Sequence, residues 1–353
     1  MRLHWFLPTG GDSRHVSSAT VTEGRTSAAV VRAPSVDYLS QVARAAEASG
    51  FEAVLVPVGI GCEDPWVLCA SVAQHTRDLR FLVAFRPGFA SPTLLAQQAA
   101  TFQRMTGDRL LLNVVTGGDP VEQRMYGDRL DHDARYARTG EYLEALDRLF
   151  AGEVVDYDGD HLKLEGARLT LDAPRPGIYF GGASPAAERV AVDRADTYLT
   201  WGEPPALVRD RVERVQKLAA DAGRELSFGI RLHVIARPTP EEAWGEAQRL
   251  LDGMDLKAIA AAQERYARMD SVGQARMTSL HRGSAESLEI SPNLWAGAGL
   301  VREGAATALV GSYEQVAERL AEYRDLGFGE AILSGWPHLE EAYNVGENVA
   351  PLL

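Results

Sequence analysis

Cysteine is scarce in this sequence. Only Cys62 and Cys69 occur among 353 residues, and they form neither a disulfide framework nor a CxxC or His/Cys metal cluster. We therefore expect a reducing, cytoplasmic environment and no metal site. The chain also lacks a P-loop, an EF-hand, an HExxH motif and a Ser-His-Asp spacing, so none of the functions that those motifs mark is indicated.

Long hydrophobic runs and basic tracts are missing as well. No apolar run approaches the ~20 residues that cross a bilayer, and the segment from Met1 to Pro8 fits a first strand better than a secretory signal. The formal net charge is −13, so neither nucleic acid nor an anionic membrane is an expected partner. Arginines that converge locally can still bind an anionic substrate in such a protein.

The sequence does contain a repeated alternation of apolar strands and amphipathic helices. Short apolar runs bounded by Gly and Pro are typical of buried parallel strands. The predicted strands are 2–7, 51–57, 79–86, 109–115, 177–181, 196–201, 227–236 and 329–335. The predicted helices are 36–49, 64–75, 91–106, 135–151, 184–193, 204–222, 239–252 and 337–348. Eight alternations without a break in composition predict an α/β fold, a single (β/α)8 TIM-barrel domain over residues 1–353.

Three stretches exceed a minimal barrel. Residues 10–35 are small and polar, and residues 152–176 contain a hairpin-like turn at 157–160. Residues 253–312 form the largest insertion, with a helix at 256–269 followed by a Gly/Ser/Pro-rich segment. Long insertions after barrel strands are commonly lids or binding loops. A packed structural excursion is the alternative.

Polar residues fall at the predicted strand ends, where a barrel of this kind carries its active site. In the strand 227–236, Arg231 and His233 alternate with apolar residues and therefore share one face. If the apolar face packs under helices, this arginine and histidine point into the barrel mouth, where they favour an anion. A buried ion pair with a carboxylate is the alternative.

Two other strand ends suit a cofactor. Gly181, Gly182 and Ser184 precede a predicted helix, an arrangement that fits a phosphate, although a tight turn has the same composition. Asn113 lies within a strand, where its amide can bond a heterocycle or the backbone.

Cysteine and tryptophan give weaker signals. Cys62 lies in a strand-end loop, whereas Cys69 lies in an apolar helix and is assigned to the core. Trp201 and Trp336 at strand ends can wall a pocket, or simply pack in the core.

Together these blocks resemble the alkanesulfonate monooxygenases of the bacterial luciferase-like, two-component flavin monooxygenase family. Long literal runs make the match specific, such as Leu-Thr-Trp-Gly-Glu-Pro-Pro at 199–205 and Glu-Ile-Ser-Pro-Asn-Leu-Trp-Ala-Gly at 289–297. The matching stretches follow the expected order over nearly the whole chain: 5–9, 62–64, 81–87, 112–119, 179–184, 198–205, 228–234, 270–273, 287–311 and 333–341.

The resemblance implies a chemistry. A separate NAD(P)H-dependent flavin reductase would supply reduced FMN, and O2 would be the co-substrate. The carbon that bears the sulfonate of a small anionic organosulfonate would be oxygenated, giving an aldehyde and sulfite. The flavin performs the difficult step, while the protein orients the substrate, binds the anion and excludes water. Relatives commonly form dimers or tetramers, so a homo-oligomer is expected.

The resemblance also implies catalytic roles. Cys62 would lie at the mouth shared by flavin and substrate, and Trp201 would line the pocket. Arg231 would bind the sulfonate or the flavin peroxide, and His233 would orient groups or exchange protons. Arg302 lies in the long insertion, where the family has a mobile loop that closes over the site. The implied FMN site comprises Arg86, Asn113, Tyr136, Gly181, Gly182 and Ser184.

Two residues depart from the family pattern. Gly10 replaces the usual histidine of Pro-Thr-His-Gly-Asp, and Trp336 replaces the usual tyrosine of Ser-Gly-Tyr-Pro-His. Both belong, with His338, to the expected substrate pocket. The alternative function is therefore oxygenation of another substrate, such as a sulfone, a sulfonated sugar or a specialised metabolite. A flavin-binding protein without turnover and a deazaflavin-dependent dehydrogenase are further alternatives.

Overall fold

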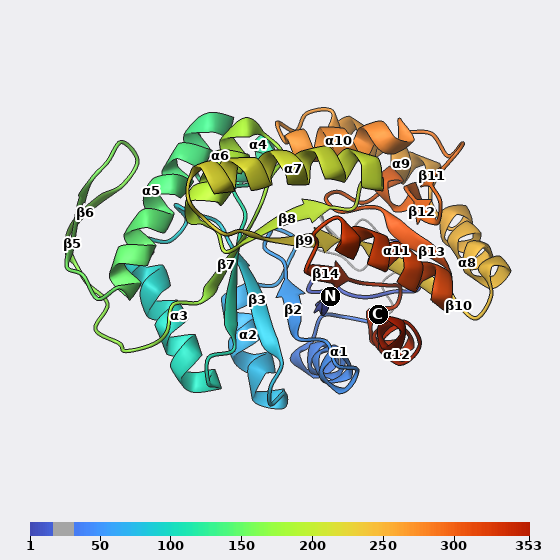
Figure 1. Cartoon of the computed structure of the whole chain (residues 1–353), viewed down its shortest axis with the longest axis horizontal. Helices are drawn as coiled ribbons and strands as arrows, with labels where there is room; N and C mark the ends of the chain where they lie inside the picture. Colours follow the sequence, from blue (N-terminus) through green and yellow to red (C-terminus); the bar gives the residue numbers. More distant parts are fainter. Residues whose placement is uncertain (17–31) are drawn as a thin grey trace.

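Eight parallel strands close into a barrel in the computed structural model of the chain, which describes residues 1–16 and 32–353 (Figure 1). The predicted TIM-barrel fold is confirmed. In pairing order the strands are β1 (Arg2–Phe6), β14 (Glu330–Leu333), β9 (Ser227–Arg231), β8 (Thr197–Trp201), β7 (Gly177–Gly181), β4 (Leu110–Val114), β3 (Arg80–Phe85) and β2 (Ala53–Val56). The wall helices are α1 (Val36–Ala48), α2 (Pro65–Val72), α3 (Pro92–Thr106), α5 (His132–Phe150), α6 (Pro185–Arg194), α7 (Pro205–Asp221), α11 (Tyr313–Asp325) and α12 (His338–Asn348).

Sequence signals at the helix starts explain several of these boundaries. The side chains of Ser35, Ser91 and Ser312 accept hydrogen bonds from backbone N–H groups in the first turns of α1, α3 and α11. Such caps satisfy donors that a helix start leaves without partners. Proline at the first positions of α2 and α3 has the backbone angle that a helix start needs.

The predicted strand 227–236 is in fact two strands. β9 ends at Arg231, and β10 (His233–Arg237) leaves the barrel to pair in parallel with β13 (Ala308–Ser312). The backbone N–H of Leu232 still donates to Ile332 of the barrel, whereas the N–H of His233 donates to Thr307. The period-two alternation continues across this change of partner, so periodicity indicated a single strand.

A four-stranded sheet and three helices form an excursion between β9 and α11. It begins at residue 233 instead of the expected 253, because the helix predicted at 239–252 packs on this sheet and not on the barrel wall. Ala243 and Leu250 of that helix share an apolar cluster with Trp295 and Val310. The elements are β10, β13, β12 (Leu294–Trp295), β11 (Glu289–Ser291), α8 (Pro240–Asp252), α9 (Leu256–Tyr266), α10 (Val272–His281) and the 3-10 turn η2 (Gly297–Leu300).

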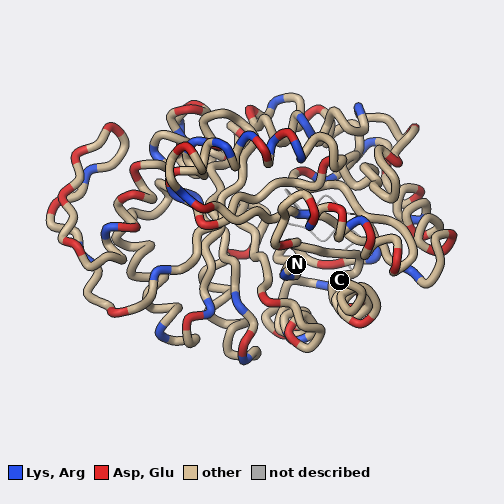
Figure 2. The backbone as a smooth tube through the Cα atoms, viewed as in Figure 1, with Lys and Arg blue, Asp and Glu red and all other residues tan. Residues whose placement is uncertain are grey.

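The other two insertions differ in character. Within 152–176, β5 (Val155–Asp158) and β6 (Lys163–Ala167) form an antiparallel hairpin that projects beyond α5 (Figure 1). Of the stretch 10–35, residues 17–31 lie outside the described part. A short helix, α4 (Pro120–Met125), follows β4. Acidic and basic residues are interspersed along the outer helices (Figure 2), and no helix in the described ranges has the length and apolarity to cross a membrane.

A charged network lies near the amino-terminal end of the barrel strands. Glu330 of β14 is fully buried and lies 2.9 Å from the Nε2 atom of His4 on β1. Arg2 also donates to this carboxylate. Burial alone would raise the pKa of Glu330, but His4, Tyr179 and Arg2 together keep this pKa below its usual 4.5.

Glu330→Gln should lower the free energy of unfolding by about 1–3 kcal/mol near neutral pH. Because the carboxyl pKa is lowered on folding, this stability is present above pH 4.5 and is lost as pH falls through the folded-state pKa. Denaturant unfolding of both proteins at about pH 7 and about pH 3 measures the difference. Glu52→Gln, which removes a half-buried carboxylate 3.7 Å from Arg2, is the control. Equal stability of wild type and Glu330→Gln at neutral pH would contradict the prediction.

Candidate active site

A two-lobed cavity lies over the carboxyl ends of the barrel strands. The lobes have volumes of about 280 Å³ each and share lining residues that include Arg86, Asn113, Trp201 and Arg231. We name them by their distinctive residues. The arginine lobe is lined by Phe6, Gly10, Asp12, Cys62, Arg231, Arg302, Trp336 and His338. The glycine lobe is lined by Tyr136, Gly181, Gly182, Ser184 and Gly273.

Arg231 ends β9 and is buried at the floor of the arginine lobe. One of its terminal nitrogens donates to the Ser334 hydroxyl at 2.8 Å, and the other faces the carbonyls of Leu232 and Ile332. It forms no ion pair with a carboxylate among the described residues, so the predicted alternative of a buried ion pair is not found there. Burial and nearby Arg302 hold the pKa of Arg231 well below its usual range.

Arg302 enters the same lobe from the segment that follows η2. Its guanidinium carbon lies 5.5 Å from the centroid of the Phe6 ring, and that of Arg231 lies 4.9 Å from the same centroid. The Nε atom of Arg302 has no hydrogen-bond partner in the described structure. Burial lowers the pKa of Arg302. The two guanidinium groups thus flank one aromatic ring, and neither is paired with a carboxylate among the described residues. Such an arrangement suits an anion.

The Arg302 segment is held down by the helices of the excursion. The amide of Gln263 on α9 donates to the Leu300 carbonyl at 3.0 Å, and Gln274 on α10 accepts the N–H of Gly304 at 2.9 Å. An ion pair of 2.9 Å joins Arg265 to Glu303. The segment thus covers the cavity here, while its mobility stays a prediction.

His233 lies behind the cavity lining. Its Nδ1 is 2.6 Å from the Ser334 hydroxyl, and its Nε2 is 3.0 Å from the Ala305 carbonyl. Because a carbonyl only accepts hydrogen bonds, Nε2 carries the ring proton and Nδ1 accepts from Ser334. Burial, with Arg231 and Arg302 nearby, holds the pKa of His233 well below its usual value. The ring is therefore neutral, and it stacks on Trp336 with 4.4 Å between centroids.

The start of α6 forms one end of the glycine lobe. Ser184 caps this helix by accepting the N–H of Ala187, and Tyr136 of α5 lies next to it. A Cβ atom on Gly182 would come within 2.4 Å of the Ala187 side chain and 3.2 Å of the Tyr136 hydroxyl. Only glycine fits there, so backbone and hydroxyl groups face one small space, an arrangement suited to a phosphate.

Polar side chains also line the space where the lobes join. Asn113 of β4 is half-buried and its amide makes no hydrogen bond within the described chain, so the predicted alternative of a backbone-satisfied amide is not seen. Arg86 donates to Glu122 at 2.5 Å, while its other two nitrogens lack partners in the described residues. Trp201 ends β8 and forms a wall of both lobes.

Cys62 lies in the loop after β2 and contributes a half-buried thiol to the arginine lobe. Burial raises its pKa, so the thiol is protonated at neutral pH and is a poor nucleophile. Cys69 is fully buried in α2, as predicted.

The luciferase-like monooxygenase family matches residues 1–330 of this sequence. The chain belongs to that family. It is therefore a flavin-dependent oxidoreductase.

Solved structures of similar fold include a long-chain alkane monooxygenase, which is 19% identical, with a TM-score of 0.80 over 99% of this chain and 90% of the other. EDTA monooxygenase from Chelativorans sp. BNC1 is 19% identical, with a TM-score of 0.78 over 100% and 93%. A riboflavin lyase is 18% identical, with a TM-score of 0.79 over 100% and 91%. At these identities the likeness to solved structures shows the fold alone.

All the site residues predicted from the sequence line this cavity except His233, which lies one layer behind the lining. Sequence reasoning missed Phe6, Asp12 and Ser334 as site residues. Ser334 and Phe6 lie at strand ends, and that position was the available signal. Among the described residues no His, Cys, Asp and Glu cluster could hold a metal ion.

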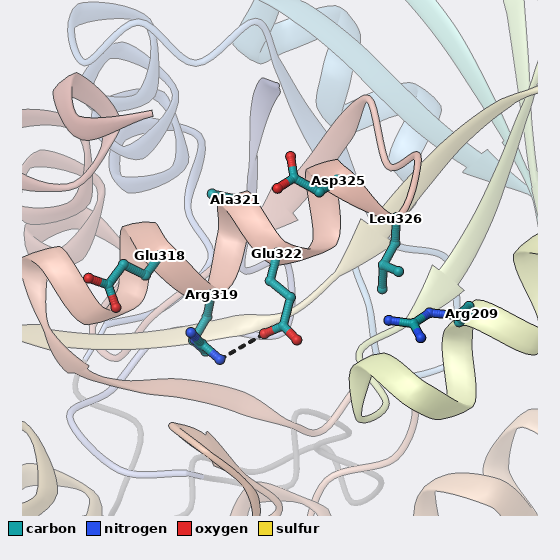
Figure 3. Close-up of a pocket in the computed structure, with 7 residues that line it drawn as sticks. All are labelled: Arg209, Glu318, Arg319, Ala321, Glu322, Asp325 and Leu326. Carbon is teal, nitrogen blue, oxygen red and sulfur yellow. Dashed lines mark hydrogen bonds and ion pairs between the residues drawn. The ribbon is translucent and has the colours of Figure 1, made fainter.

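A separate hollow on the outside of the luciferase-like barrel lies between α7 and α11 (Figure 3). Charged side chains such as Glu318, Asp325 and Arg209 line it, and Arg319 pairs with Glu322 at 2.8 Å. This hollow lies outside the barrel, between two wall helices, and most of its lining side chains are charged. It is not a candidate active site.

Sulfate should stabilise this luciferase-like protein more than chloride does at equal ionic strength, because the two arginines gain a counter-ion. Binding at about 100 times the dissociation constant corresponds to about 2.7 kcal/mol. Arg302→Met should be more stable than wild type without anions and should respond less to sulfate, as measured by thermal unfolding. Arg319→Met, on the outer surface, should respond as wild type does. An equal sulfate response in wild type and Arg302→Met would exclude an anion site at Arg302.

Proposed function

We propose that this chain is an FMNH2-dependent monooxygenase that uses O2 to desulfonate a small organosulfonate, giving an aldehyde and sulfite. A separate NAD(P)H-dependent flavin reductase would supply the reduced FMN. The observation that carries the proposal is the pair Arg231, which is buried, and Arg302, which is half-buried. Neither is paired with a carboxylate among the described residues, and their lobe adjoins a phosphate-type site. A sulfonate would supply a counter-charge to these two guanidinium groups.

The glycine lobe fits the phosphate of FMN. The hydroxyls of Tyr136 and Ser184 and the backbone near Gly182 would hold that group. The half-buried amide of Asn113, where the two lobes join, would bond the edge of the flavin ring system. Arg86, with two nitrogens that lack partners in the described residues, would add donors there. When bound, reduced FMN supplies the electrons that activate O2.

The residues of the arginine lobe bind and orient the substrate. Arg231 and Arg302 would hold the sulfonate in a dry setting, where charge interactions are stronger than in water. Trp201 and the Arg302 segment would exclude water from the reacting carbon. In the overall reaction the carbon–sulfur bond breaks. One atom of O2 becomes the aldehyde oxygen and the other leaves as water.

Oxygenation of another substrate is the second candidate function. Trp336 places a large indole against His233, and Gly10 contributes no side chain to the lining. The arginine lobe therefore differs in shape from one that has tyrosine and histidine at these positions. A lobe of this altered shape would suit a different substrate, such as a sulfone, a sulfonated sugar or a specialised metabolite.

Anaerobic mixing of the protein with reduced FMN, followed by O2 and a panel of sulfonates, tests the function. Sulfite, detected with a thiol-reactive dye, should appear only when both reduced FMN and a sulfonate are present.

Arg302→Ala should retain FMN binding but lose about 10²–10³-fold in turnover, because one hydrogen-bond donor to the anion is removed. Flavin binding without sulfite from any sulfonate would favour the second candidate. Full turnover in Arg302→Ala would contradict the role of that arginine.

Tyr136→Phe should weaken FMN binding about 10–100-fold, the effect of losing one hydrogen bond to a charged group. Binding of riboflavin, which has no phosphate, should not change. Tyr142→Phe is the matched control, because this tyrosine lies on the same helix with a buried hydroxyl that has no partner in the described structure. Fluorescence titration gives both affinities. Equal losses for FMN and riboflavin would show that Tyr136 does not contact the phosphate.

A further inference from the structure

Asp12 and His338 form a buried pair at the edge of the arginine lobe. The Oδ1 atom of Asp12 lies 2.9 Å from Nδ1 of His338, and Oδ2 accepts the backbone N–H of His338 at 2.8 Å. Exposed fractions are 3% for Asp12 and 4% for His338, and both residues line the lobe. Asp12 follows β1 and His338 begins α12 after β14, so the pair joins two neighbouring strand ends.

The hydrogen bonds fix where the ring proton lies. A carboxylate only accepts hydrogen bonds, so Nδ1 of His338 carries a proton. In the neutral ring, Nε2 then has a lone pair, and it has no hydrogen-bond partner among the described residues. A buried polar atom without a partner costs free energy unless a ligand satisfies it.

His233 offers a direct contrast. Both of its ring nitrogens are occupied, and its Nε2 donates to a carbonyl that cannot be displaced by rotation of a side chain. It also lies beside Arg231, which disfavours a second positive charge. Of the two histidines, His338 alone has an available nitrogen and an adjacent carboxylate.

We propose that His338 is the proton-transfer residue of the arginine lobe and that Asp12 positions it. Nε2 takes a proton from a substrate held by Arg231 and Arg302. The N–H bond forms as a C–H or O–H bond of the substrate breaks, and the electron pair stays on the substrate. The carboxylate of Asp12 balances the imidazolium. This inference deepens the proposed function and rests on it for the identity of the substrate.

The surroundings of the pair suit this role. The charged and titratable described groups around it are Arg32, Tyr38 and Glu340 on one side and Arg231, Arg302 and His233 on the other. Burial would raise the pKa of Asp12, but His338 and Tyr38 hold it below its usual 3.8. Asp12 is therefore ionised at neutral pH and can serve as the counter-charge.

The first test uses the protein without flavin or substrate. Nitrogen-15 NMR of histidine-labelled protein reports which ring nitrogen carries the proton, and His338→Asn assigns the signal. We expect the neutral His338 ring to be protonated at Nδ1 with a lone pair at Nε2. A neutral ring protonated at Nε2 would overturn the proposal.

The second test measures sulfite production with reduced FMN, O2 and an alkanesulfonate. His338→Asn keeps a donor toward Asp12 but has no basic nitrogen. Turnover should fall about 10²–10³-fold, with unchanged affinities for FMN and sulfonate, and the acid limb of the pH–rate profile should disappear. Added imidazole should restore part of the turnover of His338→Ala, an effect that a purely structural role would not give.

Asp12→Asn tests the positioning residue. It keeps an acceptor for His338 but removes the counter-charge, so the acid limb should move to lower pH and turnover should fall. Wild-type turnover with an unchanged pH profile in His338→Asn would overturn the proposal. If the wild-type protein releases no sulfite, the proposed function fails instead, and the NMR result still decides the state of His338.

Discussion

The upper barrel depends on two guanidinium groups, that of the buried Arg231 and that of the half-buried Arg302, which have no paired carboxylate among the described residues. Taking such charges out of water is costly, and mutual repulsion between Arg231 and Arg302 adds to the cost. Backbone carbonyls, the Ser334 hydroxyl and the face of the Phe6 ring offset part of it. An arrangement that opposes stability in this way is expected at a functional site, where the missing charge belongs to a ligand.

The same constraint sets the state of the neighbouring groups. His233 must stay neutral beside two cations, and its neutral form is the one that can accept from Ser334 while donating to Ala305. Ser334 therefore links an arginine to a histidine without itself being charged. Trp336 stacks on the ring of His233, and both residues are buried, as is Ser334. This packed layer supports Arg231 beneath the lobe through the Ser334 hydroxyl.

The sequence predicted the barrel and most of the lining because both depend on local patterns. Apolar runs bounded by Gly and Pro marked the strands, and strand ends of a parallel barrel meet at one face. Arg231 was recognised from alternation alone, since its neighbours Ile230 and Leu232 pack toward the helices. The change of strand partner after Leu232 was invisible, because β10 keeps the alternation while pairing with β13, some seventy residues later in the chain.

Contacts between distant residues account for what the sequence could not show. Asp12 and His338 are separated by 326 positions, so no local pattern relates them. At the same two strand ends, Gly10 has no side chain and Trp336 carries an indole that does not titrate near neutral pH. A histidine and a tyrosine at these two positions, as in the sequence pattern that this chain resembles, would each have supplied a titratable group. Burial keeps the Cys62 thiol protonated, so in the described part of the arginine lobe the imidazole that Asp12 holds is the group that we propose for proton exchange.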